Sequence, residues 1–305
     1  MQPSIALPAR PASTPVDLRT LCRAIGALAL APASVPAGFD HAISYHPERA
    51  GGPPATGPAE VVGSIDGIQR RWRLTTRDRR AVTLEYASAG LLPADYDHRQ
   101  LVSDQRLWLA CSYRDYDFAH DLPGGLHVEV FDAHAPRALA IATDAHTGQV
   151  RRQLEHTLAC DHHPGDDRLL VLDGSIADLP GHPQLAGIVK DVSSTAWLAD
   201  RTEIEQLPAG HRSTAFTILA EGRHRTDTAS CYLRLHPPGQ HDPWDHGLIR
   251  LETTRPCLLD PLAAWALRNR QRPNADDQRW DRHLAPIRRV EDVLRARAPQ
   301  LPTHS

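Results

Sequence analysis

Two short stretches of the sequence place an aspartate between apolar residues and a glycine. Ser64–Gly67 reads SIDG and Val171–Ser175 reads VLDGS, and an apolar run precedes each aspartate. An aspartate at the end of a buried strand is held rigidly near the centre of the sheet and faces a cleft, where its oxygens suit a hard divalent cation. Asp-Gly is also an ordinary turn signal, because glycine lets the backbone turn sharply. Asp66 and Asp173 are therefore candidate metal ligands, with two simple turns as the alternative.

A third carboxylate, Glu155, comes from a predicted helix just before the second aspartate. Apolar residues recur at four-residue steps between His146 and Cys160, which indicates a helix that a short connection joins to the next strand. Three carboxylates around one point repel one another unless cations lie between them, and this is the logic of two-metal phosphoryl chemistry. The alternative for Glu155 is a solvated pair with Arg151, one helical turn away.

Two more polar side chains adjoin predicted strands. Lys190, in GIVKDV, is the only lysine of the chain. Its compact charge fits a phosphate or carboxylate contact, and a chance surface lysine is the alternative. HDPWDHGLIRLE places Asp242, Asp245 and His246 before another strand. His246 could bind a metal or carry a proton to a leaving group, although either Asp245 or His246 could face the site.

Arginines gather directly after the first Asp-Gly. The stretch RRWRLTTRDRR interleaves Trp72 with Arg70, Arg71, Arg73, Arg77, Arg79 and Arg80. Such a patch neutralises phosphates and stacks a base, and a solvated hairpin face explains it equally well. The formal net charge of the chain is only -3, so DNA binding must rest on local patches of this kind.

Length and composition suit a globular protein. The chain has 305 residues and five scattered cysteines without metal-knuckle spacing, which favours a reduced, cytoplasmic setting. No stretch approaches the roughly 20 apolar residues of a membrane-spanning helix, so we expect no membrane partner.

The order of apolar patterns predicts a mixed α/β sheet flanked by helices. Stretches rich in Pro and Gly set off an N-terminal extension, residues 1–58, with a short helix at Val16–Leu30. The core is expected at 59–256, and a C-terminal helical segment, 257–305, completes the domain. Expected strands include 59–67, 79–90, 107–115 and 125–133, with further strands from 167 to 252 and helices at 258–271 and 286–298.

Taken in order, these motifs resemble the NurA family of nucleases, in its bacterial branch. The resemblance runs from about residue 60 to residue 297. It rests on SIDG, RRQLE, LLVLDGS, LAGIVKDVSSTAWLAD, LPAGHRSTAFTIL, SCYLRL, PWDHGLIRLE and HLAPIRRVEDVLR.

The resemblance implies an RNase H-like fold and a deoxyribonuclease that needs Mn²⁺ or Mg²⁺, with two ions in the site. It also implies a homodimer that works with a HerA-type hexameric translocase in processing DNA ends. Asp66, Glu155 and Asp173 match the family's metal-binding carboxylates, and His246 matches its late histidine. By the same resemblance, Tyr232 and Arg234 of SCYLRL would line the site and contact DNA.

Two functions of different class remain open from the sequence. The first is hydrolysis of DNA phosphodiester bonds, which the presence of all three carboxylates favours. The second is an RNase H-like scaffold that binds DNA or a translocase and cleaves nothing. Net acidity favours the scaffold, as does Ile68, which stands where the family usually has serine. A third possible function is that of some other metal-dependent phosphoesterase.

Overall fold

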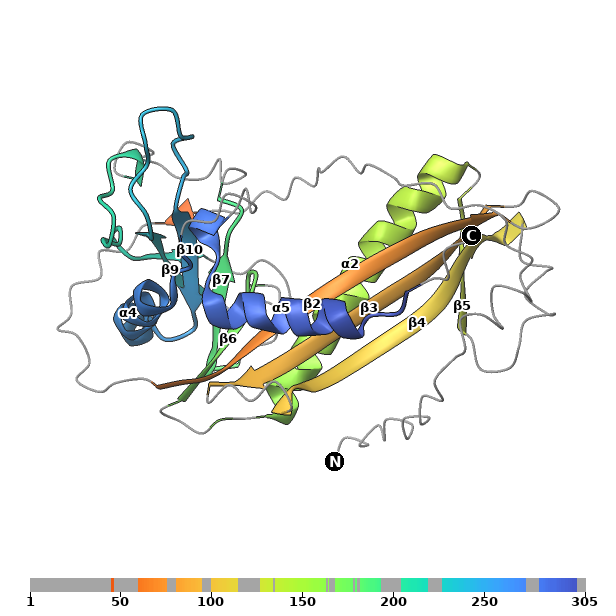
Figure 1. Cartoon of the computed structure of the whole chain (residues 1–305), viewed down its shortest axis with the longest axis horizontal. Coiled ribbons are helices and arrows are strands. Elements are labelled where there is room, and N and C mark those ends of the chain that lie inside the picture. The colour runs from red at the N-terminus through yellow and green to blue at the C-terminus, as the bar shows by residue number, and fades with distance from the viewer. Residues whose placement is uncertain are drawn as a thin grey trace.

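The protein is an α/β protein built around one mixed sheet (Figure 1). The computed structural model describes residues 45–46, 60–75, 81–94, 100–114, 127–133, 135–162, 164, 168–177, 179, 182–192, 204–218, 227–272 and 280–300. The sheet comprises strands β2 to β10, and the two-residue strand β1 adds to one edge.

The elements have the following bounds. The strands are β1 (Tyr45–His46), β2 (Glu60–Thr75), β3 (Ala81–Pro93), β4 (Val102–Ser112), β5 (His127–Phe131), β6 (Arg168–Asp173), β7 (Leu185–Val189), β8 (Phe216–Ile218), β9 (Thr228–Arg234) and β10 (Leu248–Thr253). The helices are α2 (Pro136–Asp161), α4 (Leu259–Asn269) and α5 (Ala285–Arg297), with short 3-10 turns η3 (Pro256–Leu258) and η4 (Trp280–Arg282).

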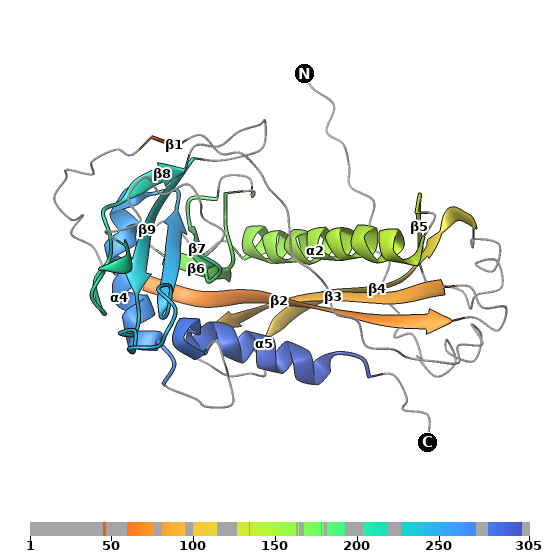
Figure 2. The same cartoon turned by 90° about the horizontal axis from the view of Figure 1, so that it is seen from above.

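The strand order is β1-β8-β9-β10-β7-β6-β2-β3-β4-β5. β2, β3 and β4 form an antiparallel meander, and the chain then returns through α2 to β6, which lies parallel to β2. β7 lies parallel to β6, and β10 pairs antiparallel to β7. Helices α2 and α5 cover opposite faces of the meander (Figure 2).

Both faces of the meander are buried because the apolar side chains of β2, β3 and β4 alternate. Ala87, Ala89 and Trp108 pack against the apolar stripe of α2. Ile68 and Tyr86 belong to the opposite cluster, with Val290 and Leu294 of α5. A sheet covered on two sides leaves little solvent for a polar side chain placed on its central strands.

One edge of β2 is left open part-way along the strand. β6 ends at Asp173, beside the middle of β2, whereas β2 continues to Thr75. Among the described residues no strand covers this edge from Gly67 onward. Side chains from the two faces of the sheet can therefore approach each other around this edge, which lies between α2 and α5.

Several expected elements are confirmed and two are corrected. The predicted strands within the described residues and both C-terminal helices are present. The prediction of a turn at the first Asp-Gly is wrong, because β2 continues through Gly67 and stays paired with β3. The second Asp-Gly does end its strand, and Gly174 has a φ of 124°.

Helix α2 begins at Pro136, well before the predicted start near His146. The early part of its buried face carries Thr143 and Thr147, so the apolar repeat that marks the rest of the helix is missing there. The predicted helix Val16–Leu30 and most of the 1–58 extension lie outside the described residues, as do Arg77, Arg79 and Arg80.

In the described part of the chain, no helix combines the length and hydropathy needed to cross a membrane.

A buried arginine ties together the loops beside β9 and β10. Arg234, at the end of β9, has no exposed surface, and its guanidinium donates hydrogen bonds only to backbone carbonyls. The acceptors are the carbonyl oxygens of Ile204, Glu205, Leu207, Trp244 and His246, at 2.6–3.4 Å. Because five carbonyls share one side chain, Arg234 is a structural anchor of this end of the sheet.

We expect Arg234→Met to destabilise the fold by roughly 3 kcal/mol, because it leaves several buried carbonyls without donors. Urea unfolding measures the change. Arg268→Met, which changes an exposed arginine on α4, is the control and should shift stability by no more than about 0.5 kcal/mol. Equal effects of the two substitutions would contradict the role given to Arg234.

Candidate functional site

Asp66 and Asp173 lie side by side on neighbouring parallel strands. Ile65 of β2 is in register with Leu172 of β6, so the next residue on each strand is an aspartate. Asp66 is 4% exposed, and its Oδ1 accepts a hydrogen bond of 2.7 Å from the backbone N–H of Gly67. The sheet thus fixes both aspartates at the point where β6 ends.

Asp173 is paired with the single lysine of the chain. Lys190 follows β7, and its Nζ lies 2.8 Å from Oδ2 of Asp173. Both side chains retain some exposure, 17% for Lys190 and 23% for Asp173. The sequence predicted that Lys190 contacts a carboxylate or a phosphate, and the carboxylate it contacts is that of Asp173. A contact with phosphate stays a prediction.

Glu155 reaches the same point from α2 because Gly67 has no side chain. A Cβ at Gly67 would overlap Oε1 of Glu155 and would lie 2.7 Å from Cγ of Arg151. Strand alternation directs Asp66 toward α5, and Gly67 faces α2. Glu155 and Asp66 thus approach the open edge of β2 from opposite faces, and Glu155 forms an ion pair with Arg151.

The three carboxylates influence one another electrostatically. Burial raises the pKa of Asp66 well above its usual value, Asp173 and Glu155 raise it further, and Lys190 opposes the rise. Burial likewise raises the pKa of Glu155 to about 7, against the lowering effect of Arg151 and Arg152, and Asp173 adds to the rise. Repulsion of this kind requires that the charges share one neighbourhood.

Glu252, on β10, fixes the turn that follows Asp173, and sequence reasoning missed it. Its fully buried carboxylate accepts hydrogen bonds from Ser175 Oγ at 2.7 Å and from the Ile176 N–H at 2.9 Å, and it also pairs with Arg250. The signal was the alternation of charged Arg250 and Glu252 with leucine inside LIRLE. Two charges on one face of an apolar strand indicate a buried pair rather than a solvated edge.

His246 lies apart from the three carboxylates. Its Nδ1 is 3.6 Å from a carboxylate oxygen of Asp242 and 3.6 Å from one of Asp281, and its ring meets Trp280. The neighbouring Asp245 pairs instead with Arg282 at 2.8 Å. None of the contacts described for His246 joins it to Asp66, Glu155 or Asp173.

The predicted DNA-binding residues have different surroundings. Arg70 is half-buried near α5, and Arg73 is exposed. Arg71 pairs with the buried Glu85 at 2.6 Å and so braces β2 against β3. Tyr232, like Arg234, has no exposed surface, so neither is placed to contact DNA.

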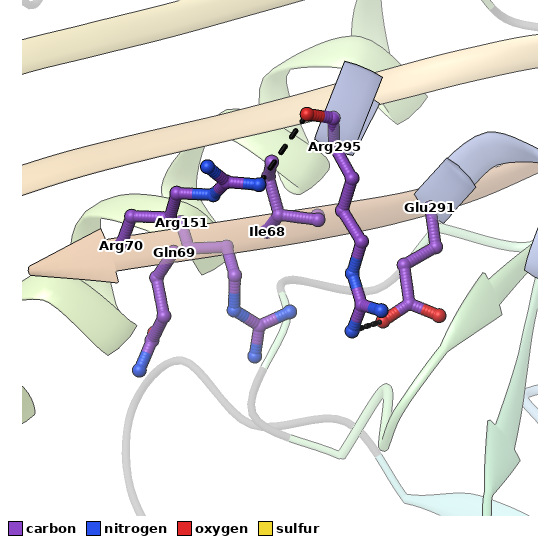
Figure 3. Close-up of a pocket in the computed structure, with 7 residues that line it drawn as sticks. Ile68, Gln69, Arg70, Arg151, Glu291 and Arg295 are labelled. Atoms are coloured by element: carbon purple, nitrogen blue, oxygen red, sulfur yellow. Dashed lines mark hydrogen bonds and ion pairs between the residues drawn. The ribbon is translucent and has the colours of Figure 1, made fainter. Parts of the chain in front are cut away.

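A pocket of about 230 Å³ lies along the open edge of β2. Residues from β2, α2 and α5 line it (Figure 3): Gly67, Ile68, Gln69, Arg70, Arg151, Glu291 and Arg295. It begins at Gly67, next to the three carboxylates, and continues between the two helices that cover the sheet.

The donor set of the site fits a divalent cation in its chemistry. Burial and neighbouring acids raise the pKa of Asp66 and of Glu155, so both carboxylates gain from a cation placed near them. As they stand, however, no group of three or more His, Cys, Asp or Glu side chains in the described ranges is arranged so that it could hold a metal ion. Glu155 is turned to Arg151 and Asp173 to Lys190, so cation binding requires both carboxylates to leave these partners.

Comparisons of the chain with models of known protein families and with curated proteins found no match. The site must therefore be judged on its own geometry and chemistry.

The raised pKa of Glu155 predicts a measurable pH dependence of stability. The folded state binds a proton that the unfolded chain has already lost between pH 4.5 and about 7, so the free energy of unfolding falls as pH rises through this window. The contribution is at most roughly 3 kcal/mol. Urea unfolding in EDTA should show a smaller fall for Glu155→Gln than for the wild type, and identical slopes would contradict the raised pKa.

Gly67→Ala tests the close approach of α2 to β2. The added methyl group meets Glu155 and Arg151 and forces both away, so we expect a loss of about 1–3 kcal/mol in unfolding free energy. Gly148→Ala is the matched control, since a Cβ there meets nothing nearer than 3.9 Å. Alanine also raises helix propensity at that position, so the control should be neutral or stabilising. A Gly67→Ala protein as stable as the wild type would contradict the contact.

Proposed function

We propose that this protein is a divalent-metal-dependent deoxyribonuclease, with Asp66, Glu155 and Asp173 as its metal-binding carboxylates. The observation that carries the proposal is that three acidic side chains from β2, α2 and β6 lie around one open strand edge, where Asp173 and Glu155 are near enough to raise the pKa of Asp66. A fold has little reason to bury repelling charges together unless a ligand uses them.

The topology supports the RNase H-like part of the proposal. An antiparallel meander, β2-β3-β4, is followed through a helix by β6 and β7, which lie parallel to β2 on its other side. This is the arrangement that the resemblance to the NurA family implies. In it, the first strand, the helix and the fourth strand of the core each supply one carboxylate.

The chain's own residues supply orientation and charge. β2 and β6 hold two carboxylates rigidly, and Glu252 fixes the turn behind Asp173. Lys190 and Arg151 neutralise the acids until a cation replaces them. When bound, Mn²⁺ or Mg²⁺ would neutralise the scissile phosphate and activate water, in the manner of two-metal phosphoryl transfer. No described contact joins His246 to the three carboxylates, so it is given no role in this step.

The proposal extends to partners only through the resemblance. A homodimer and a HerA-type translocase in DNA end processing belong to it, because NurA-like nucleases work in that setting.

A catalytically inactive scaffold is the second candidate, and one observation favours it. Each of the three acids already has a partner within the protein: a backbone N–H for Asp66, Arg151 for Glu155 and Lys190 for Asp173. The fold is therefore stable without a metal. A protein that only binds DNA would keep this state throughout.

The decisive assay is degradation of linear single- and double-stranded DNA with and without Mn²⁺. We expect Mn²⁺-dependent cleavage that Asp173→Asn lowers by at least about 100-fold, because the substitution removes a charge that must face the cation. Asp161→Asn, at the exposed end of α2, is the control and should retain wild-type activity. Cleavage by Asp173→Asn at the wild-type rate would defeat the proposal, and inactivity of every protein in the presence of the translocase would favour the scaffold.

A further inference from the structure

The pocket on the open edge of β2 is rich in guanidinium groups. Arg70 of β2, Arg151 of α2 and Arg295 of α5 line it, with Glu291 as its one acidic residue. Figure 3 shows Arg70, Arg151 and Arg295 together in the pocket, and they come from three different elements. Residues far apart in the sequence thus bring three positive charges to one cavity.

The arginines are only partly engaged by the protein. Arg70 donates a hydrogen bond of 3.4 Å to the carbonyl oxygen of Arg295, and in the described part of the chain it pairs with no carboxylate. Arg295 is 50% exposed and pairs with Glu291 at 2.5 Å, and Glu291 also pairs with Arg288 at 3.1 Å. A half-exposed guanidinium can exchange such a protein partner for an external anion at small cost.

The shape and lining of the pocket favour a phosphate over a base. Guanidinium forks match the oxygens of a phosphate, which they can bind through two parallel hydrogen bonds. No aromatic ring is among the lining residues, so a nucleobase finds nothing to stack on. The pocket also begins at Gly67, against which Glu155 packs, so an anion in it is adjacent to the carboxylate site.

We propose that this pocket is a phosphate subsite that holds the backbone of one DNA strand next to the bond to be cleaved, through Arg70, Arg295 and Arg151. The proposal rests on the nuclease function, which it deepens by assigning the strand's path along β2 toward α5. Recognition is of the phosphodiester and is independent of base sequence. Glu291 limits the affinity, because it competes with the phosphate for Arg295.

The test measures binding without cleavage. A fluorescently labelled single-stranded thymidine oligonucleotide is titrated with the full-length protein in EDTA, and anisotropy gives the Kd at several salt concentrations. We expect Arg295→Gln to raise the Kd about fivefold and to reduce the slope of log Kd against log salt by about 0.7, the value for one phosphate contact on a single strand. Arg70→Gln should act in the same way.

The sharper test is a gain of binding, because misfolding cannot produce it. Glu291→Gln should lower the Kd about fivefold, since it releases Arg295 and removes a negative charge from the pocket. Its matched control is Asp292→Asn, which removes the same charge from the next residue of α5, is 57% exposed and also pairs with Arg288. Arg297→Gln, on the same helix, is the control for Arg295→Gln. Both controls should stay within about twofold of the wild type.

Two further probes separate the possible ligands. An abasic oligonucleotide of the same length should bind as the thymidine strand does, and inorganic phosphate should compete only at far higher concentration, since it makes one contact rather than several. Competition by free phosphate at the concentration of the oligonucleotide would overturn the assignment to a DNA strand.

The outcomes distinguish this inference from the nuclease proposal. If Asp173→Asn abolishes Mn²⁺-dependent cleavage but Arg295→Gln binds no worse than Arg297→Gln, or Glu291→Gln no better than Asp292→Asn, the subsite is wrong and the nuclease stands. If the expected pattern of binding appears in a protein that cleaves nothing, the subsite stands and the nuclease is wrong. Absence of binding by the wild type overturns the subsite directly.

Discussion

The close packing of α2 against β2 at Gly67 is the constraint on which the site depends. With no side chain at this position, the carboxylate of Glu155 lies where a Cβ would otherwise be. The short strand β6 ends at the same level and leaves the edge of β2 open. Asp66, from the face that α5 covers, and Glu155, from the face that α2 covers, therefore both approach that edge, and Glu155 raises the pKa of Asp66.

Such packing concentrates acidic side chains where little water can reach them. Positively charged side chains of the protein offset this charge. Lys190 pairs with Asp173, and Arg151 pairs with Glu155. These pairs explain how a cluster of buried acids is compatible with a stable fold. They also define what a divalent cation has to do on binding, which is to take over the roles of one lysine and one arginine. Arg151, together with Arg70 and Arg295, lines the adjoining pocket, where these arginines suit the phosphate that we propose for it.

The sequence predicted the sheet, the two C-terminal helices and the candidate acids, because alternation and helical periods are local patterns. It failed where a local signal had a non-local cause. Gly67 indicated a turn, but the glycine serves the contact with α2. The resemblance implied that Arg234 and Tyr232 contact DNA, but a strand covered on both faces buries them. Glu252 was overlooked because its role depends on β10 lying beside β7, and no local pattern encodes that pairing.

Calorimetric titration of the metal-free protein with Mn²⁺, in buffers of different ionisation enthalpy, tests the central claim most directly. A cation that draws Asp66, Glu155 and Asp173 together must displace protons held at raised pKa values. The account predicts saturable binding with proton release at pH 6.5, less release above pH 8, and loss of most of the affinity in Glu155→Gln. Absence of saturable binding, or equal binding and proton release in Glu155→Gln and the wild type, would contradict it.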